Sequence, residues 1–189
     1  MAIVGESGVG KSTLLNLVAG LDRPDTGTIV VAGRDLAAMS DDELTLFRRE
    51  NIGFVFQAFH VLPYLTVAQN VALPLVLLNY DETIANGRVG DMLNAVGLGD
   101  RGTSMPRELS GGELQRTAIA RALVHRPKVV LADEPTGNLD PATAASVIDL
   151  LRDRVHDAGA SGVVVTHSRA AAACADRVLT LTAQGLSEA

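Results

Sequence analysis

The stretch that decides the fold is Gly5-Glu6-Ser7-Gly8-Val9-Gly10-Lys11-Ser12-Thr13, which fits the phosphate-binding loop pattern G-x-x-x-x-G-K-[ST]. It follows the apolar residues 2–4, which are typical of a strand, and it precedes an apolar stretch that predicts a helix. Backbone N–H groups of such a loop converge on phosphate oxygens, and the helix N-terminus adds a favourable dipole. We expect Lys11 to reach the β- and γ-phosphates of a nucleotide and the Ser12 hydroxyl to bind Mg²⁺.

Length and composition limit the function classes that remain. The 189 residues suit one domain with its own core, so we take residues 1–189 as a single domain. The net charge of −6 argues against a surface that coats nucleic acid. Cys174 is the only cysteine, which excludes an internal disulfide and suits a reducing compartment. The longest apolar run, residues 71–78, is too short to span a bilayer, so membrane association would require a partner.

Strand and helix patterns alternate along most of the chain, which predicts an α/β fold with a mostly parallel sheet and flanking helices. The expected strands are residues 1–4, 28–31, 52–56, 128–132 and 162–166, followed by a hairpin at 178–186; the expected helices are 11–19, 81–96 and one that begins at Asp140-Pro141. Prolines punctuate the part between the strands 52–56 and 128–132. We expect a helical subdomain there, at about residues 58–122.

A second motif is Leu109-Ser110-Gly111-Gly112-Glu113-Leu114-Gln115-Arg116. Ser110 and Glu113 fit a capping box at the start of an apolar-periodic helix. Gly111 and Gly112 expose backbone N–H groups at that start, which makes it a second candidate anion site. Two phosphate-binding helix ends in one small domain are unusual, and a simple explanation is that two copies face each other and share each site.

A third motif, residues 129–134, is a buried strand that ends in two carboxylates. Ligands of parallel α/β sheets bind at the carboxyl ends of the strands. We expect Asp133 to hold Mg²⁺ through water, and we expect Glu134 to point to the other side of the strand. There Glu134 could act as a general base on the attacking water.

Together these motifs resemble those of the ATP-binding subunit of an ABC transporter, a P-loop NTPase. Gln57 matches the Q-loop glutamine of this family, residues 135–140 match its D-loop, and His167 matches its switch histidine. The resemblance covers nearly the whole chain. It is strongest to the branch that contains the lipoprotein-releasing, macrolide-export and cell-division proteins, through residues 20–24, 48–57, 70–74 and 132–140.

The resemblance implies an ATPase that uses ATP and Mg²⁺ and forms a homodimer when ATP binds. ATP would lie between the loop of one chain and Ser110, Gly111 and Gly112 of the other, and the D-loop Asp140 would couple the two sites. Ser12, Gln57 and Asp133 would organise Mg²⁺. Glu134, His167 and Gln57 would be the catalytic residues.

The resemblance also implies partners and a location. An integral membrane permease subunit would hold the chain on the cytoplasmic face of the cell membrane, and no nucleic acid is expected. The permease would meet the chain near residues 57–65. Apolar surface would be offered there by Phe56, Phe59, Leu62 and Leu65. The alternative within this branch is a regulatory ATPase of a cell-division complex that signals without transport. Superfamily members in DNA repair or translation fit less well, because the chain has no long coiled coil and only one cassette.

One departure from the family concerns the start of the chain. Family members usually carry antiparallel strands and an aromatic residue for the adenine base before the phosphate-binding loop, and no such aromatic precedes Gly5 here. We therefore expect the N-terminal antiparallel strands to be missing, which would weaken base recognition and expose a sheet edge.

Overall fold

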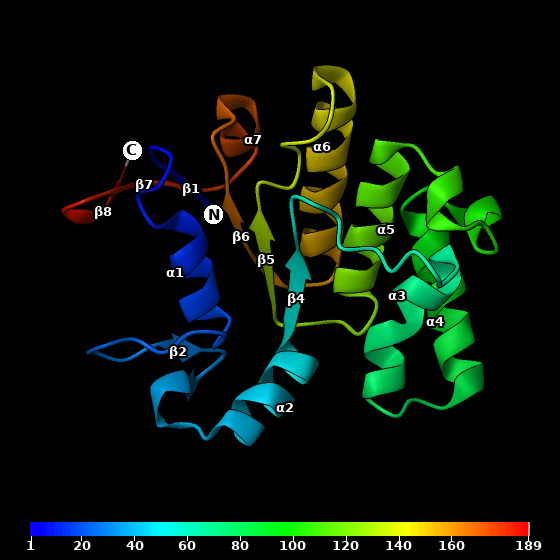
Figure 1. The fold of residues 1–189 in the computed structure, drawn as a ribbon, viewed down its shortest axis with the longest axis horizontal. Coiled ribbons are helices and arrows are strands. Elements are labelled where there is room, and N and C mark those ends of the chain that lie inside the picture. Colours follow the sequence, from blue (N-terminus) through cyan, green and yellow to red (C-terminus); the bar gives the residue numbers. More distant parts are fainter. Residues whose placement is uncertain (189) are drawn as a thin grey trace.

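Six strands form the central sheet, in the spatial order β4-β5-β6-β1-β7-β8 (Figure 1). The structure is a computed structural model and describes residues 1–188. The strands of this sheet are β1 (Ala2–Val4), β4 (Ile52–Val55), β5 (Val129–Asp133), β6 (Ser161–Val165), β7 (Val178–Thr182) and β8 (Gly185–Glu188). Neighbours from β4 to β7 are parallel, and β8 pairs antiparallel with β7 as the predicted hairpin. The predicted fold class, α/β with a mostly parallel sheet, is confirmed.

Helices cover both faces of the sheet. They are α1 (Lys11–Val18), α2 (Asp41–Asn51), α3 (Val67–Leu77), α4 (Glu82–Ala95), α5 (Gly111–Leu123), α6 (Pro141–Asp157) and α7 (Arg169–Ala173), with short 3-10 turns at Leu36–Ala38, Gly99–Arg101 and Pro106–Glu108. Helices α1 and α2 pack on one face, and α5, α6 and α7 pack on the other (Figure 1). Along residues 1–188, no helix is both long enough and apolar enough to cross a membrane.

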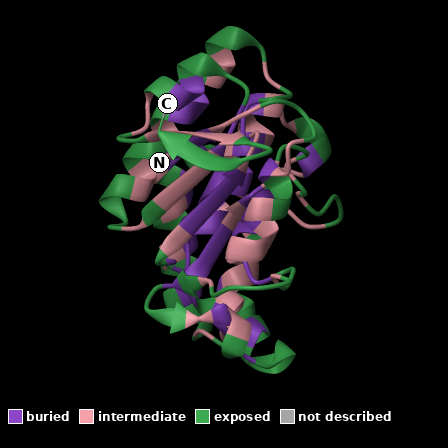
Figure 2. Cartoon of the chain, turned by 90° about the vertical axis from the view of Figure 1, so that its left-hand side faces the viewer, coloured by how far each residue is buried: buried purple, intermediate pink, exposed green. Residues whose placement is uncertain are grey.

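Strand β5 illustrates how one short apolar run serves two cores. Leu131 packs in the cluster under α1 and α2, whereas Val130 and Ala132 pack in the cluster under α5 and α6. Successive side chains of a strand point to opposite faces, so a strand covered on both faces must be apolar at every position. Figure 2 shows the result as a band of buried strands enclosed by more exposed helices.

Helices α3, α4 and α5 form a separate arm with a third hydrophobic cluster. Gly87 and Gly90 weaken the intrinsic helix propensity of α4. The helix forms because Asp81 caps its N-terminus and Ala85, Val89 and Leu93 are buried against the neighbouring helices. Helix α5 belongs to both cores, since Ile119 and Leu123 face the sheet while Ala120 and Val124 face the arm.

The strand expected at residues 28–31 is shorter in the structure and lies outside the central sheet. Only Val30–Val31 forms a strand (β2), and it pairs antiparallel with β3 (Arg34–Asp35) in a separate two-stranded sheet. The cause is the tight turn between them, in which Ala32 and Gly33 both have positive φ, at 49° and 77°. Such a two-residue turn joins antiparallel strands and leaves no room for a crossover to the main sheet.

His125 is a buried titratable group at the end of α5, and it makes stability depend on pH. It is 8% exposed, and burial lowers its pKa from 6.5, although the Ile52 backbone offsets part of the shift. Because the folded pKa is lowered, the unfolded state binds more protons as the pH falls below about 6.5. The free energy of unfolding should therefore fall below pH 6.5, by at most about 1.4 kcal/mol per pH unit from this residue.

Denaturant unfolding of His125→Phe between pH 7.5 and 5.5 tests this expectation. The variant should lose the part of the pH dependence that His125 causes, whereas His156→Phe, which changes an exposed histidine, should keep it. Identical pH profiles for the His125 variant and the wild type would contradict the assignment.

Candidate functional site

The register of three parallel strands brings the predicted motifs to one edge of the sheet. Ile3 of β1 pairs with Val165 of β6, and Val165 in turn pairs with Asp133 of β5. The segments that follow these strands are the phosphate loop (Gly5–Thr13), Glu134 and His167. They lie together because the carboxyl ends of parallel strands meet at the same edge.

The phosphate loop needs glycine for its backbone conformation. Gly8 and Gly10 have φ values of 80° and 103°, in a region that other residues rarely adopt, and a β-carbon at either position would meet no neighbouring atom. Helix α1 begins at Lys11 with no side-chain cap and no acidic residue in its first turn. Its first N–H groups are therefore available to an anion.

Lys11 is 6% exposed, and its ammonium lies under the loop. Nζ donates to the carbonyl oxygens of Gly5 at 2.9 Å and Glu6 at 2.8 Å, and it lies 3.3 Å from Nε2 of His167. An ammonium held at carbonyl oxygens can exchange them for phosphate oxygens with a gain in charge-assisted hydrogen bonding.

Glu134 and His167 are in direct contact across neighbouring strand ends. Oε2 of Glu134 accepts a hydrogen bond from the His167 backbone N–H at 3.2 Å, and Oε1 lies 3.2 Å from His167 Nε2. Nε2 therefore faces both the lysine and the carboxylate. It can accept from Lys11, or in the other protonation state donate to Glu134, but it cannot do both at once. The proton on this ring links the three side chains.

Glu134 has a φ of 45°, a left-handed conformation in a residue that has a side chain. Its backbone N–H still donates to Val165 O at 2.9 Å, so the chain leaves the strand only after Glu134. Non-glycine residues in this region are held by their surroundings and concentrate at functional sites.

Asp133 and Ser12 fit the oxygen donors that Mg²⁺ prefers. Asp133 has the same strand parity as Leu131, which packs in the α1 cluster, so its carboxylate lies on the α1 side of the sheet. Ser12 is exposed in the first turn of α1. No group of three or more His, Cys, Asp or Glu within residues 1–188 could hold a metal ion.

Gln57 follows β4 and lies against the turn after β5. Its carbonyl oxygen accepts from Asn138 Nδ2 at 2.9 Å, and a β-carbon on Gly137 would lie 2.8 Å from Gln57 Nε2. Among the described residues, no hydrogen bond joins Gln57 to Lys11 or Asp133. The structure thus places Gln57 beside residues 137–138 rather than in the Lys11 cluster.

The signature segment (residues 109–116) lies elsewhere on the molecule. Ser110 caps α5, and its backbone N–H and hydroxyl both donate to Glu113 Oε2 at 2.8 Å, which lowers the pKa of Glu113. Gly111 and Gly112 lie against Leu139 and Thr143 near the start of α6. Figure 1 shows α1 and α5 on opposite sides of β4 and β5, so the phosphate loop and the signature segment of one chain are far apart.

Asp140, the D-loop carboxylate, caps α6. Its Oδ1 accepts from the backbone N–H groups of Ala142 at 3.2 Å and Thr143 at 3.1 Å. Hydrogen bonding by Thr143 lowers the pKa of Asp140. Its role in this structure is that of a helix cap, as the Asp-Pro pattern predicts.

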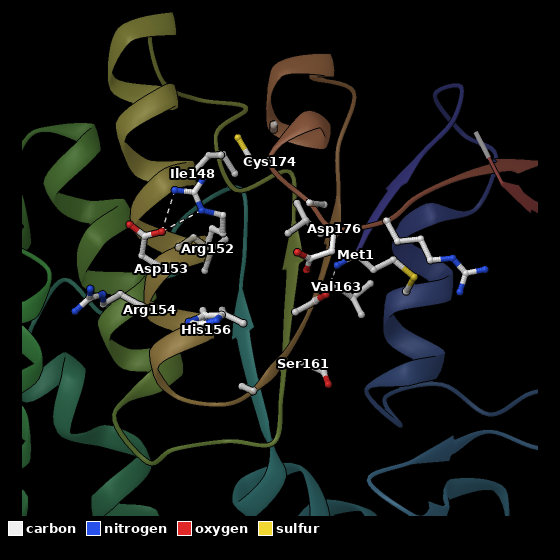
Figure 3. A pocket seen from close by; sticks show the side chains of 18 of the residues that line it. Met1, Ile148, Arg152, Asp153, Arg154, His156, Ser161, Val163, Cys174 and Asp176 are labelled. Atoms are coloured by element: carbon white, nitrogen blue, oxygen red, sulfur yellow. Dashed lines mark hydrogen bonds and ion pairs between the residues drawn. The ribbon is translucent and has the colours of Figure 1, made fainter.

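A large cavity of about 850 Å³ lies along β6 between α6 and α7 (Figure 3). Its lining includes none of the predicted site residues. The arginines that line it are already paired: Arg152 bridges Asp149 and Asp153, Arg154 bridges Asp157, and Arg177 bridges Glu188. We therefore place the functional site at the phosphate loop and not in this cavity.

Comparisons with known proteins agree with the family that the motifs indicate. The family model described as ABC transporter matches residues 1–137. The lipoprotein-releasing system ATP-binding protein LolD of Xanthomonas campestris is 50% identical over 181 residues, which cover 96% of this chain and 76% of that protein. LolD of Shewanella oneidensis is 47% identical, over 96% of this chain and 79% of that protein. The chain thus spans about three quarters of the length of these relatives.

Solved structures agree with the fold. The ATP-binding cassette MJ0796, solved as a dimer in a post-hydrolysis state with ADP and Pi, superposes with a TM-score of 0.86 at 37% identity. The alignment covers 99% of this chain and 84% of that one. A second dimeric structure of the same cassette gives a TM-score of 0.87 at 38% identity, with the same coverage.

Lys11→Ala tests the assignment of the phosphate loop. Loss of a charge-assisted contact should weaken binding of a fluorescent nucleoside triphosphate about 10- to 100-fold, measured by titration. The other lysine of the chain, Lys128, is exposed at the far end of β5 and provides a matched control. Lys128→Ala should bind like the wild type, and equal affinities for the two variants would refute the assignment.

Proposed function

The chain belongs to the ABC transporter family as an ATP-binding subunit, and we propose that it powers a membrane partner through ATP-dependent dimerisation. In this proposal residues 1–189 form one ATPase domain, and its helical subdomain spans about residues 58–122. ATP is the substrate and Mg²⁺ the cofactor. Hydrolysis yields ADP and phosphate and opens the dimer.

The separation of the two anion-binding helix ends is the observation that carries the proposal. Lys11 is the first residue of α1 and Ser110 caps α5. These two helices lie on opposite sides of β4 and β5 (Figure 1). A single nucleotide cannot contact both within one chain. If a second copy turns its signature segment toward the first copy's phosphate loop, both helix ends bind the same triphosphate. The dimeric structures of the similar cassette support this arrangement.

The cluster of Lys11, Glu134 and His167 supports the hydrolytic step. The loop amides and the Lys11 ammonium hold the phosphates, and His167 donates to the γ-phosphate. Glu134 accepts a proton from the attacking water. At the same time the water oxygen forms a bond to the γ-phosphorus, and the bond between this phosphorus and ADP breaks. Ser12, Gln57 and Asp133 would hold Mg²⁺, which neutralises charge on the phosphates.

The membrane partner would meet the segment after Gln57. Leu62 is 46% exposed and Tyr64 is 90% exposed in this segment, while Phe59 and Leu65 are half-buried. Exposed apolar side chains next to the site suit a contact with the permease. Such a contact could transmit to the permease whether ATP or ADP is bound. The LolD relatives favour a partner of the lipoprotein-releasing type over the macrolide-export and cell-division types. In this proposal the permease holds the chain at the cytoplasmic face of the membrane.

Glu134→Gln tests the proposed chemistry. Without the base, turnover of ATP should fall at least about 100-fold while nucleotide binding persists. The variant should remain dimeric in sedimentation with Mg²⁺ and ATP, because nothing removes the γ-phosphate. Glu50→Gln, which changes an exposed glutamate on α2, is the control. Normal turnover in the Glu134 variant would exclude this residue as the base.

Ser110→Arg tests the role of the signature segment. A bulky cation at the start of α5 should prevent the ATP-dependent dimer and still let the monomer bind ATP through its phosphate loop. Ser146→Arg places the same side chain on an exposed position of α6 and should dimerise normally. If the Ser110 variant sediments as a dimer with ATP, the second copy does not use this segment.

A further inference from the structure

The backbone just after Gln57 adopts a conformation that its residues do not favour. Phe59 and His60 follow each other with φ values of 61° and 46°, and both carry side chains. A left-handed conformation in such residues costs free energy and persists only where the surroundings hold it. What holds this pair therefore sets the path of the chain that leads away from Gln57.

Arg121 of α5 holds both residues. Its Nη1 donates to His60 O at 2.6 Å and its Nη2 donates to Phe59 O at 2.9 Å, so the planar guanidinium spans two consecutive carbonyls. Burial lowers the pKa of Arg121, and no carboxylate within residues 1–188 lies within ion-pair distance of it. A partly desolvated cation without a carboxylate partner depends on these two carbonyls.

Two other side chains fix the ends of the same segment. Asn138 donates to Gln57 O from the turn after β5. Asn70, which is fully buried in α3, accepts from Leu62 N at 2.7 Å and donates to Leu62 O at 3.1 Å. Residues 57–62 are thus held by three side chains, all of which bond to backbone atoms. Arg121 is the one that comes from the helix whose N-terminus is Ser110.

We propose that Arg121 is a positioning residue that sets the placement of Gln57 and couples it to α5. The inference rests on the proposed function, in which Gln57 takes part in hydrolysis and Ser110 contacts the nucleotide of the other chain. Arg121 lies about three turns along α5 from Ser110. Because a helix moves as a rigid rod, a shift of α5 caused by contact at Ser110 displaces the Phe59 and His60 carbonyls through the guanidinium. Gln57 moves with them.

Steady-state ATPase kinetics of the full chain test the proposal. Arg121→Met removes both donors and keeps an unbranched side chain, so kcat should fall about 10- to 100-fold through misplacement of Gln57. The KM for ATP should change less than about threefold, because the phosphate loop is untouched. Arg121→Lys keeps the positive charge but cannot donate to both carbonyls in the planar geometry of a guanidinium, so it should give an intermediate kcat. Arg88→Met is the matched control, since Arg88 is also half-buried in the arm but contacts Tyr80.

A double-mutant cycle separates positioning from general structural support. If Arg121 acts through Gln57, Arg121→Met should cause no further loss of kcat in a Gln57→Ala background. Additive losses would overturn the proposal, as would wild-type kcat in Arg121→Met. Should the Met variant fail to fold, the cycle is run with Arg121→Lys.

Hydrogen exchange gives a readout that does not need turnover. In Arg121→Met, exchange in the peptide that covers residues 57–62 should accelerate at least about tenfold, while α6 exchanges as in the wild type. An unchanged exchange rate in residues 57–62 would show that Arg121 does not stabilise this segment. Failure of the proposed function has a different signature, namely normal turnover in Glu134→Gln or ATP-driven dimers of Ser110→Arg. In that case the exchange result still decides whether Arg121 holds the segment.

Discussion

The parallel register of β1, β6 and β5 is the constraint on which the site depends. It aligns Ile3, Val165 and Asp133, so the three segments that follow these strands begin at the same height. Lys11 Nζ and Glu134 Oε1 can then lie 3.3 and 3.2 Å from His167 Nε2, although the three residues come from distant parts of the chain. A slip of one residue in β5 would move Asp133 to the opposite face and Leu131 out of its core, so the core that stabilises the fold also fixes the chemistry.

Much of this site could be predicted from sequence because its determinants are local. The spacing of Gly5, Gly10 and Lys11 specifies a loop between a strand and a helix, and the Asp140-Pro141 pair specifies a helix start; the structure has both. The spatial order of the strands could not be predicted, because pairing joins β4 to β5 and β1 to β6 across long stretches of chain. The sheet that the strand within residues 28–31 joins could not be predicted for a related reason: strand propensity does not say which sheet a strand joins.

The contacts of Arg121 and Asn138 left no signal in the sequence. Both side chains bond to carbonyl oxygens, and every residue has a carbonyl, so the identity of Phe59, His60 or Gln57 does not reveal the partner. The left-handed pair at Phe59 and His60 was equally hidden, because glycine is the residue that usually marks this conformation. Sequence motifs therefore predicted the residues expected to contact the nucleotide. They did not predict the residues that hold those contacts in position.

Helix α5 is the element through which the two parts of the molecule can influence each other. Its Ile119 and Leu123 are packed in the sheet core and its Ala120 and Val124 in the core of the arm, so a displacement of α5 disturbs both. Close-packed cores resist gradual deformation, and such a helix is better suited to move as a unit between two packings. The bonds from Arg121 to the segment after Gln57 then provide a polar connection from the arm to the site. The strands hold Lys11, Glu134 and His167 in place. In the proposal above, by contrast, the segment that carries Gln57 moves when α5 moves.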